Sequence, residues 1–465
     1  MNTKFRVNPP IRAKELRASL SMVIAAICFG TVFFSVTQGT ALTGFARQMG
    51  ASDFVFSLLM AMPVIAGVFQ VIGSYLLERG GSRRRLFLRS LYPQRLIWIP
   101  VALVPLLIKN ENLRISAVIL LVFAANACGS IGGVAFMSWM SDLVPAEIRG
   151  RFFGVRSALS TAVGVVSAWV VGKFLDQHTD FTGYAIVFII AALFGAADIA
   201  FFHFVKEPPM NRSTGPLRFS QIITEPLRSK RFTRFLLFWC CTMFSYLLIG
   251  SFAQVYLLES LSLRISVVSF YTQVVPNMAI FLAASLWGIM IDRFGCKPVI
   301  WIALAVQSAV PFLWFFTTAD RWWLLVSINF ITGFFWSAFD MVAINLLMRT
   351  SPDRNRSAYI ANYALITGIF GNAAAYISAG AFLSFIHPLV GLLDLTILGS
   401  KVTRFHFLFL LSGILRVATL VFVHPIIDEP GASSVGEMLK SIFRHKGRRR
   451  TPPPPQQVAT VEIKG

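Results

Sequence analysis

Charged residues are scarce in this sequence. They make up 14% of the 465 positions, whereas apolar residues make up 56%; a soluble domain carries roughly 25% charged residues. A soluble fold with so little charge would expose large apolar patches, so the missing water-facing surface must face lipid. We therefore expect an all-α membrane protein, whose length is divided among helix spans of about 20 apolar residues each.

Cysteine and histidine are also few, and neither shows metal-binding spacing. The five cysteines, which include the adjacent pair Cys240 and Cys241, mostly lie inside apolar runs, as small core residues do. The six histidines are scattered, and the sequence contains neither a nucleophile elbow nor a phosphate-binding loop. We expect no enzyme activity, no metal, no cofactor and no ATP-driven transport within this chain.

Long polar stretches are rare as well, so the chain divides into apolar runs. The single long polar interior stretch, 206–234, separates six runs from six. We expect a cytoplasmic basic head at 1–18, a six-helix bundle at 19–205, a cytoplasmic linker at 206–234, a second six-helix bundle at 235–427 and a basic, proline-rich cytoplasmic tail at 428–465. The twelve runs long enough to span a membrane lie near 19–45, 54–77, 86–108, 115–140, 152–175, 184–205, 235–258, 265–291, 298–317, 322–348, 358–386 and 405–427.

Acidic residues are few: Lys and Arg outnumber Asp and Glu two to one, and the formal net charge is +21. Nucleic-acid binding is not the interpretation we favour, because the basic residues lie in short loops between the spans. The loops on one side of the membrane hold about four times as many Lys and Arg as those on the other side, which orients the protein. We expect both termini in the cytoplasm, a monomer in a bacterial cytoplasmic (inner) membrane, and attraction of the tail to anionic lipid.

Two loops of the first half reappear in the second half. Glu78-Arg79-Gly80 follows the second span, and Asp292-Arg293-Phe294-Gly295 follows the eighth. Pro145-Ala146-Glu147-Ile148-Arg149 precedes the fifth span, and Pro352-Asp353-Arg354-Asn355-Arg356 precedes the eleventh. Two echoes in the same order, in equivalent loops of two six-span halves, indicate an internal duplication.

The second-half loop also carries a family resemblance. Gly288-Ile289-Met290-Ile291-Asp292-Arg293-Phe294-Gly295-Cys296-Lys297 resembles the G-x-x-x-D-R-x-G-x-[KR] signature of the major facilitator superfamily, whereas the first half has Glu78 in place of Asp and Ser74 in place of the glycine. The resemblance implies twelve transmembrane helices in two six-helix bundles related by a pseudo-two-fold axis, with substrate bound between them. It implies a secondary active transporter that works by alternating access.

The resemblance also places the repeated loop of each half opposite the other half. Glu78 is then expected near Arg356, and Asp292 near Arg149, with Arg79 and Arg293 beside the two acids. Opposite charges at helix ends attract each other, so these residues would form a cytoplasmic latch that holds one access state. The simpler alternative is that these loops only set topology and hairpin geometry.

Four ionisable side chains other than histidine lie deep in the spans: Arg95, Asp198, Asp340 and Arg416. Such residues are costly and face protein or a water-filled cavity. One interpretation pairs Arg95 with Asp198 and Asp340 with Arg416. The resemblance adds another for Asp340, because spans one, four, seven and ten line the cavity in this family, which makes Asp340 the candidate for proton coupling. Spans three, six and twelve are peripheral in the family, which favours structural roles for the other three.

Polar side chains on or beside the cavity-lining spans are candidates for substrate contact. For each of them the alternative is a hydrogen bond that joins two helices, and we expect fewer than half to touch substrate. They are Gln38, Asn126, Tyr246, Gln254, Asn329, Trp336 and Asn345 on spans one, four, seven and ten, and Gln273, Asn277, Asn362 and Asn372 on spans eight and eleven.

Several functions stay open at this point. The amides favour import of a neutral polar small molecule such as a sugar or nucleoside, with protons as the candidate coupling ion, whereas the Trp and Phe residues favour export of drugs or amphipathic compounds. A non-transporting receptor or assembly factor with the same fold is the alternative of a different class, because fold does not determine function.

Overall fold

The computed structural model describes residues 13–209, 224–352, 356–391, 396–397, 400–427, 429 and 431–444. The first part of the expected head, the middle of the expected linker and the expected tail beyond residue 444 lie outside the described residues. Nearly all of the described chain is helical; residues Thr396–Ile397 (β1) and Ser400–Lys401 (β2) form a two-residue antiparallel ladder in which Thr396 faces Lys401.

The first half is built from nine α-helices and one 3₁₀ turn in the described residues: α1 (Ala13–Thr37), α2 (Thr40–Gln48), α3 (Asp53–Ile65), η1 (Ala66–Val68), α4 (Phe69–Gly80), α5 (Arg83–Leu96), α6 (Trp98–Leu107), α7 (Glu111–Leu143), α8 (Ala146–Gln177) and α9 (Phe181–Phe201).

The second half and the C-terminal segment contain α11 (Lys230–Leu247), α12 (Gly250–Glu259), α13 (Ile265–Ser269), η2 (Phe270–Val274), α14 (Val275–Phe294), α15 (Cys296–Leu313), η3 (Trp314–Phe316), α16 (Trp322–Thr350), α17 (Arg356–Ile366), η5 (Thr367–Ala373), α18 (Ala374–Gly391), α19 (Arg404–Ala418), η6 (Thr419–Val423), η7 (His424–Ile426) and α20 (Val435–Arg444).

These elements join into twelve spans among the described residues, each long and apolar enough to cross a membrane. Span one is α1 with α2, span two runs from α3 to α4, and span three is α5 with α6. Spans four, five and six are α7, α8 and α9. In the second half, spans seven to twelve are α11 with α12, α13 to α14, α15 with η3, α16, α17 to α18, and α19 with η6. The twelve predicted spans are confirmed, and their ends lie within a few residues of the predicted ends.

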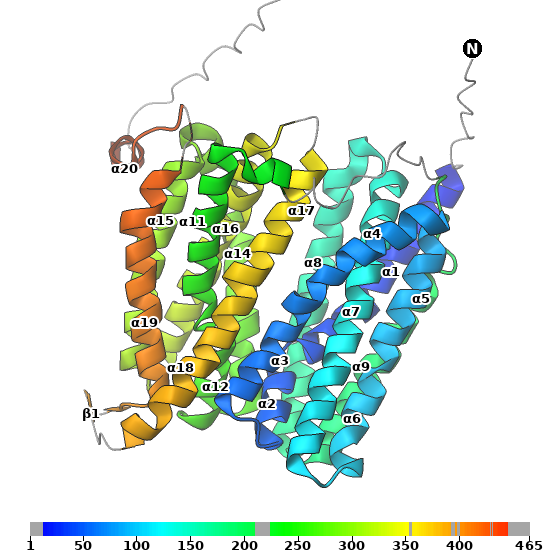
Figure 1. Ribbon diagram of the computed structural model, residues 1–465, viewed down its shortest axis with the longest axis horizontal. Coiled ribbons are helices and arrows are strands. Elements are labelled where there is room, and N and C mark those ends of the chain that lie inside the picture. Colours follow the sequence, from blue (N-terminus) through cyan, green and yellow to red (C-terminus); the bar gives the residue numbers. More distant parts are fainter. Residues whose placement is uncertain are drawn as a thin grey trace, which may run out of the picture.

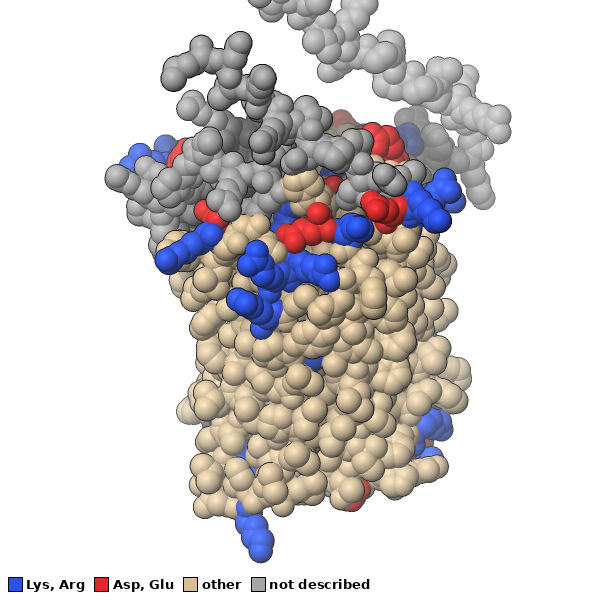
Figure 2. Space-filling view, turned by 90° about the vertical axis from the view of Figure 1, so that its right-hand side faces the viewer, with Lys and Arg blue, Asp and Glu red and all other residues tan. Residues whose placement is uncertain are grey.

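The spans form two six-helix bundles that stand side by side (Figure 1). Within the first bundle, α1 packs on α8 and α9, and α5 packs on α7; within the second, α14 packs on α16, and α15 on α19. The protein is an integral, multi-pass membrane protein with the predicted two-bundle architecture. Its apolar band, nearly free of charge on the face drawn in Figure 2, separates a strongly charged end from a sparsely charged one.

We call the end with the start of α1, the turn between α4 and α5, and α20 the basic end. The other end, with the turns between α2 and α3 and between α6 and α7, is the opposite end (Figure 1). The basic end carries the arginines of the turn between α4 and α5, where Gly81 closes α4 with a φ of 63°. A positive φ costs glycine nothing, which explains the glycine at this tight turn.

In each bundle, a glutamate that follows the last span accepts hydrogen bonds at the start of that bundle's third span. Glu207 accepts hydrogen bonds from the Arg83 backbone N–H and, at 3.2 Å, from the Ser82 hydroxyl at the start of α5. Glu429 accepts bonds from the backbone N–H groups of Cys296 (3.0 Å) and Lys297 (2.6 Å) at the start of α15. A carboxylate at a helix N-terminus satisfies free N–H groups and the helix dipole.

This pair of caps is a third repeat that sequence analysis missed. A Glu-Pro dipeptide follows the last span of each half, at Glu207-Pro208 and Glu429-Pro430, and it is the signal that could have revealed the caps. The second cap also pairs with Arg349 at the end of α16, and the Glu429 side chain is 1% exposed. The caps therefore tie span three to span six and span nine to span twelve.

Replacing Glu429 with Ala is expected to lower the free energy of unfolding by roughly 1–3 kcal/mol, because buried N–H groups and Arg349 lose their acceptor. The midpoint of thermal unfolding in detergent measures the change. Asp320→Ala, at an acid exposed in a turn, is the matched control and should leave the midpoint unchanged. Equal midpoints for the two variants would contradict the capping role.

Candidate functional site: a polar cavity between the bundles

Spans one and seven are each broken between two helices. Span one is broken at Gln38 and Gly39, between α1 and α2, and span seven is broken between Leu247 and Gly250. A Cβ on Gly39 would lie 2.2 Å from the Ser35 carbonyl oxygen and 3.0 Å from the Gln273 amide, so only glycine fits at the first break. Breaks in membrane helices free backbone groups for hydrogen bonding, which makes them common at binding sites.

A cavity of about 330 Å³ lies between the bundles, beside the break in span one. Its first-half wall comes from spans one and five, and its second-half wall comes from spans seven and eight. Four of the predicted contact residues line it together: Gln38, Gln254, Gln273 and Asn277. Thr31, Ser35, Ser160 and Thr161 add hydroxyl groups that the prediction did not include.

Two hydrogen bonds cross between the bundles at this cavity. The Thr43 hydroxyl donates to the Gln254 side-chain oxygen at 2.9 Å, and the Gln273 amide donates to the Thr40 hydroxyl at 3.1 Å. Both threonines lie on α2, directly after the break in span one. These bonds link α2 to α12 and to the π-helical turn η2, and π turns often occur at functional sites.

The other predicted amides use their NH₂ groups elsewhere or lie outside this cavity. Asn126, Asn329 and Asn345 donate to carbonyl oxygens one turn earlier in their own helices, at 2.8–2.9 Å. Asn362 lines another, smaller cavity between spans two and eleven. Asn372 lies in the π-helical turn η5, with a buried side-chain oxygen that has no hydrogen-bond partner among the described residues.

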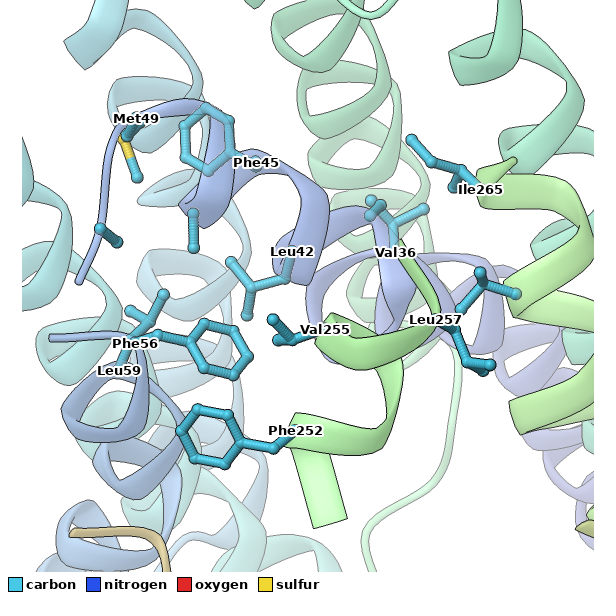
Figure 3. Close-up of a cluster of buried hydrophobic side chains, with 14 of the residues drawn as sticks. Val36, Leu42, Phe45, Met49, Phe56, Leu59, Phe252, Val255, Leu257 and Ile265 are labelled. Atoms are coloured by element: carbon cyan, nitrogen blue, oxygen red, sulfur yellow. The ribbon is translucent and has the colours of Figure 1, made fainter. Parts of the chain in front are cut away.

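An apolar cluster closes the space between the bundles near the opposite end. Leu42 of α2 and Phe56 of α3 face Phe252 and Val255 of α12 (Figure 3). Phe45 of α2 packs against Tyr184 and Phe188 within the first bundle. The Phe56 and Phe252 rings meet edge to face, with centroids 5.4 Å apart. Side chains with this burial each contribute about 1.5–3 kcal/mol on transfer from water, so the cluster excludes water from this end.

Two glycines allow the helices of the two bundles to touch there. A Cβ on Gly172 of α8 would lie 2.6 Å from the Ser266 Cα of α13, and one on Gly380 of α18 would lie 2.1 Å from the Ser57 hydroxyl of α3. The two contacts occupy equivalent places in the two halves. Small residues let membrane helices approach closely, so these glycines mark where the bundles meet.

A four-residue charge network spans the two bundles at the opposite end. Arg47 and Asp53 of the first half pair at 2.6 Å, and Arg404 and Glu259 of the second half pair at 2.9 Å. Cross pairs join the halves, Arg47 with Glu259 at 3.2 Å and Arg404 with Asp53 at 2.8 Å. Asp53 is 6% exposed. Sequence analysis missed this network because its four members lie at helix ends beside three turns that are far apart in the sequence, where charges look like ordinary topology signals.

The intramembrane charges of the first bundle form the predicted ion pair. Arg95 Nη2 lies 2.9 Å from Asp198 Oδ2, and both side chains are buried, at 3% and 10% exposure. Phe33 and Phe34 cover the guanidinium, whose carbon lies 4.2 Å and 4.6 Å from their ring centres. The pair lines a cavity inside the bundle, although spans three and six were expected to be peripheral.

The suggested pair of Asp340 with Arg416 is wrong for this structure. Arg416 is buried with its guanidinium carbon 3.8 Å from the Tyr246 ring centre, and its Nη1 donates to the Gln307 carbonyl oxygen at 2.8 Å. Trp336 packs edge to face on Tyr246. Asp340 instead is exposed on α16 and has no ion-pair partner among the described residues. The charge of Arg416 is thus stabilised by a cation–π contact and a carbonyl acceptor, and not by the carboxylate that the sequence suggested.

Among the side chains that the structure describes, no ion pair of the predicted latch is formed. Glu78, Arg79, Asp292 and Arg293 are exposed at the basic end, and neither acid has an ion-pair partner within the described part of the chain. Arg149 donates to the Ser141 carbonyl oxygen at 2.9 Å, inside its own bundle. The Arg356 side chain lies outside the described residues. The latch therefore stays a prediction about a conformation in which the basic end is closed.

The described residues include no group of three or more His, Cys, Asp or Glu side chains that could hold a metal ion. The chemistry of the cavity is that of amide and hydroxyl groups, which donate and accept hydrogen bonds. Such a lining can bind a polar solute without forming a covalent bond to it.

The sequence matches the profile of the Major Facilitator Superfamily over residues 20–274 and 235–448. The chain therefore belongs to this superfamily, as the repeated loop motif indicated, and the fold is that of a secondary transporter. A comparison with curated protein sequences finds no match.

Several solved transporter structures share the fold. A single-residue mutant of the nucleoside transporter NupG is 13% identical with a TM-score of 0.70, covering 88% of this chain and 100% of its own. The xylose transporter XylE from E. coli, in an inward-open conformation, is 14% identical with a TM-score of 0.63, covering 92% and 99%. A bacterial homologue of the human lysosomal transporter Spinster, inward-facing and occupied, is 15% identical with a TM-score of 0.60, covering 90% and 95%.

Replacing Asp53 with Asn is expected to open the opposite end more often, because its internal pair with Arg47 and its cross pair with Arg404 both weaken. A loss of about 1.4 kcal/mol would raise the open population about tenfold. The measurement is the rate at which an impermeant maleimide, added on the side of the opposite end, labels a cysteine placed at Gln38 in a chain without its native cysteines.

Asp180→Asn is the control for this experiment. Asp180 lies at the same end outside the network, and the hydrogen bond from the Gly183 backbone N–H lowers the pKa of its carboxyl group. Asn keeps that N-cap, so labelling should stay at the rate of the parent. A parent-like rate in Asp53→Asn would show that the network does not hold this end closed.

Proposed function

We propose that this protein carries a small organic solute across the membrane by alternating access, through the cavity between its bundles. The observation that supports this most is the cavity itself, which lies between the halves, beside the break in span one, and is lined by Gln38, Gln254, Gln273 and Asn277. Hydrogen-bonding groups at the midpoint of two repeats are the usual place for a substrate in such folds.

We infer that the basic end faces the cytoplasm of a bacterial cell and that both chain ends lie there, because basic loops stay inside. In that orientation the charge network and the apolar cluster close the outer end, so the protein is inward-facing. Two of the similar solved structures are described as inward-open or inward-facing. The latch between the repeated loops would then form when the protein turns outward.

Amide side chains accept from hydroxyl groups and donate to carbonyl or ring oxygens, so the cavity suits a solute rich in such groups. Uridine and xylose are the first probes, since the similar structures include a nucleoside and a xylose transporter. The aromatic residues around Tyr246 and Trp336 lie elsewhere in the second bundle, which weighs against an exporter of purely apolar drugs.

Uptake of radiolabelled probes into proteoliposomes tests the proposal. A transporter moves a probe across the membrane, whereas a receptor or assembly factor with this fold binds without flux. Thermal stabilisation of the purified protein by a probe measures binding separately, because a ligand of the folded state raises its unfolding midpoint. Binding without flux would favour the receptor alternative.

Gln38→Ala is expected to weaken binding of a transported probe about fivefold to tenfold, which corresponds to the loss of one hydrogen bond of roughly 1 kcal/mol. Gln38 is exposed to the cavity and has no side-chain partner among the described residues. Asn329→Ala is the control, because Asn329 is buried and bonds to its own helix. The Michaelis constant for uptake measures the effect, and equal constants for the two variants would remove Gln38 from the site.

We further propose that Asp340 couples transport to protons, since it is an exposed acid on span ten with no ion-pair partner among the described residues, and span ten is one of the spans that line the cavity in this family. Asp340→Asn is expected to abolish accumulation driven by a pH gradient while exchange of solute continues, because Asn cannot take up a proton. Uptake is measured with and without a proton ionophore. Asp320→Asn, at an exposed acid in the turn before α16, serves as control. Full concentrative uptake by Asp340→Asn would end this assignment.

A further inference from the structure

The first bundle contains a cavity of its own, which we call the second cavity. It is separate from the polar cavity that Gln38 and Gln254 line between the bundles. It has a volume of about 260 Å³ and lies among spans one, three, four, five and six. Most of its wall is aromatic or aliphatic, with Phe34, Phe87, Phe136 and Phe202 among the lining residues. Ile27 and Phe34 belong to the walls of both cavities, so the two spaces adjoin at span one.

The charges in this second cavity do not balance. Arg95 and Arg156 bring two positive charges to its wall, and Asp198 brings one negative charge. The carboxylate pairs with Arg95 at 2.9 Å, and Arg156 makes no ion pair within the described residues. Its guanidinium carbon instead lies 5.4 Å from the Phe136 ring centre. One positive charge is therefore left over in a largely apolar space, where an unpaired charge is expensive.

The donors on these arginines are also unused. Arg95 is 3% exposed, yet its Nε and Nη1 have no hydrogen-bond partner among the described residues, and neither has the buried Nε of Arg156. Contact with ring faces stabilises a positive charge, but it supplies no acceptor for these N–H groups. Buried polar groups are nearly always bonded, so donors without partners at a cavity wall indicate an acceptor that belongs there.

Two glycines leave the space that the Arg95–Asp198 ion pair occupies. A Cβ on Gly30 would lie 2.6 Å from the Asp198 carboxylate, and one on Gly195 would lie 2.6 Å from the Arg95 side chain. The ion pair itself therefore fills the space that side chains at these two positions would occupy. Gly133 of span four, which also lines the cavity, has nothing within 4 Å of its Cβ position. The ion pair therefore packs closely against spans one and six, whereas the cavity wall at Gly133 is open.

We propose that this cavity binds the anionic group of an amphipathic monoanion, a carboxylate attached to an apolar body. The carboxylate would accept hydrogen bonds from Arg95 and Arg156, whose planar donor sets match its geometry. It would bring the charge of the cavity to zero. The phenylalanine rings would surround the apolar body.

This inference goes beyond the proposed function, because it concerns a different cavity, and it rests on that proposal only for its biological meaning: an organic anion would bind to the transporter beside the proposed solute cavity. The tests can fail independently. Flux of uridine or xylose without binding of an aromatic acid would refute the anion site alone. Binding of the acid without flux of any probe would refute transport alone.

The test compares 3-phenylpropionate with its neutral analogue 3-phenylpropionamide, which has nearly the same shape. Binding is measured by titration calorimetry on the full chain in lipid nanodiscs, so that no detergent occupies the apolar space. The acid is expected to bind at least tenfold more tightly than the amide. Equal affinities, or binding of neither compound, would overturn the proposal.

Three variants then test the charges. Arg156→Gln neutralises the surplus charge and should weaken binding of the acid at least tenfold, while Asp198→Asn adds a net positive charge and should tighten it severalfold. Arg151→Gln, at an exposed arginine on the same helix, removes the same charge outside the cavity and should change the affinity less than twofold.

Opposite effects of Arg156→Gln and Asp198→Asn distinguish a binding site from a structural ion pair, since damage to packing would weaken binding in both. Thermal unfolding of each variant checks folding. If Asp198→Asn does not fold, the comparison of Arg156→Gln with Arg151→Gln still decides the matter. Acid binding that is unaffected by Arg156→Gln would overturn the proposal.

Discussion

A charge inside the apolar part of a membrane protein needs a partner, and this requirement shapes the interior of both bundles. A charged group left alone there costs several kcal/mol. In the first bundle Arg95 meets the requirement with the carboxylate of Asp198. In the second, Arg416 lies on the ring of Tyr246 and donates to the Gln307 carbonyl oxygen. A buried arginine is therefore stabilised by an ion pair in the first bundle, and by a ring and a carbonyl oxygen in the second.

The contacts between the halves follow the duplication more closely than the interiors do. Gly172 on Ser266 and Gly380 on Ser57 are equivalent close contacts, and each half contributes one arginine and one acid to the charge network. Paired contacts of this kind give the two halves equivalent points of close approach. In the proposed alternating-access cycle these contacts let the helices move with small changes in packing, because glycine contacts carry little side-chain interlocking.

The fold was predictable because its signals are long. Twenty apolar residues in a row identify a span almost regardless of detail, and two repeated loops identify the duplication. The site was less predictable, because it depends on the direction in which each side chain points. Gln254 and Asn345 look alike in sequence, yet Gln254 lines the cavity and accepts a bond from the other bundle, whereas Asn345 bonds to its own helix. Helix breaks such as the one at Gly39 change that direction locally, and sequence periodicity does not reveal the turn.

The ion pairs show a second limit of sequence reasoning. Depth along a helix places Asp340 and Arg416 at similar levels, which suggests a pair. Depth says nothing about azimuth, and the two side chains lie on different faces: Arg416 faces Tyr246 inside the bundle, whereas Asp340 is exposed. Arg95 and Asp198 share both depth and direction, because Gly30 and Gly195 leave the space that fits them. A charge pair within a membrane is thus predicted by the small residues around it as much as by the charges themselves.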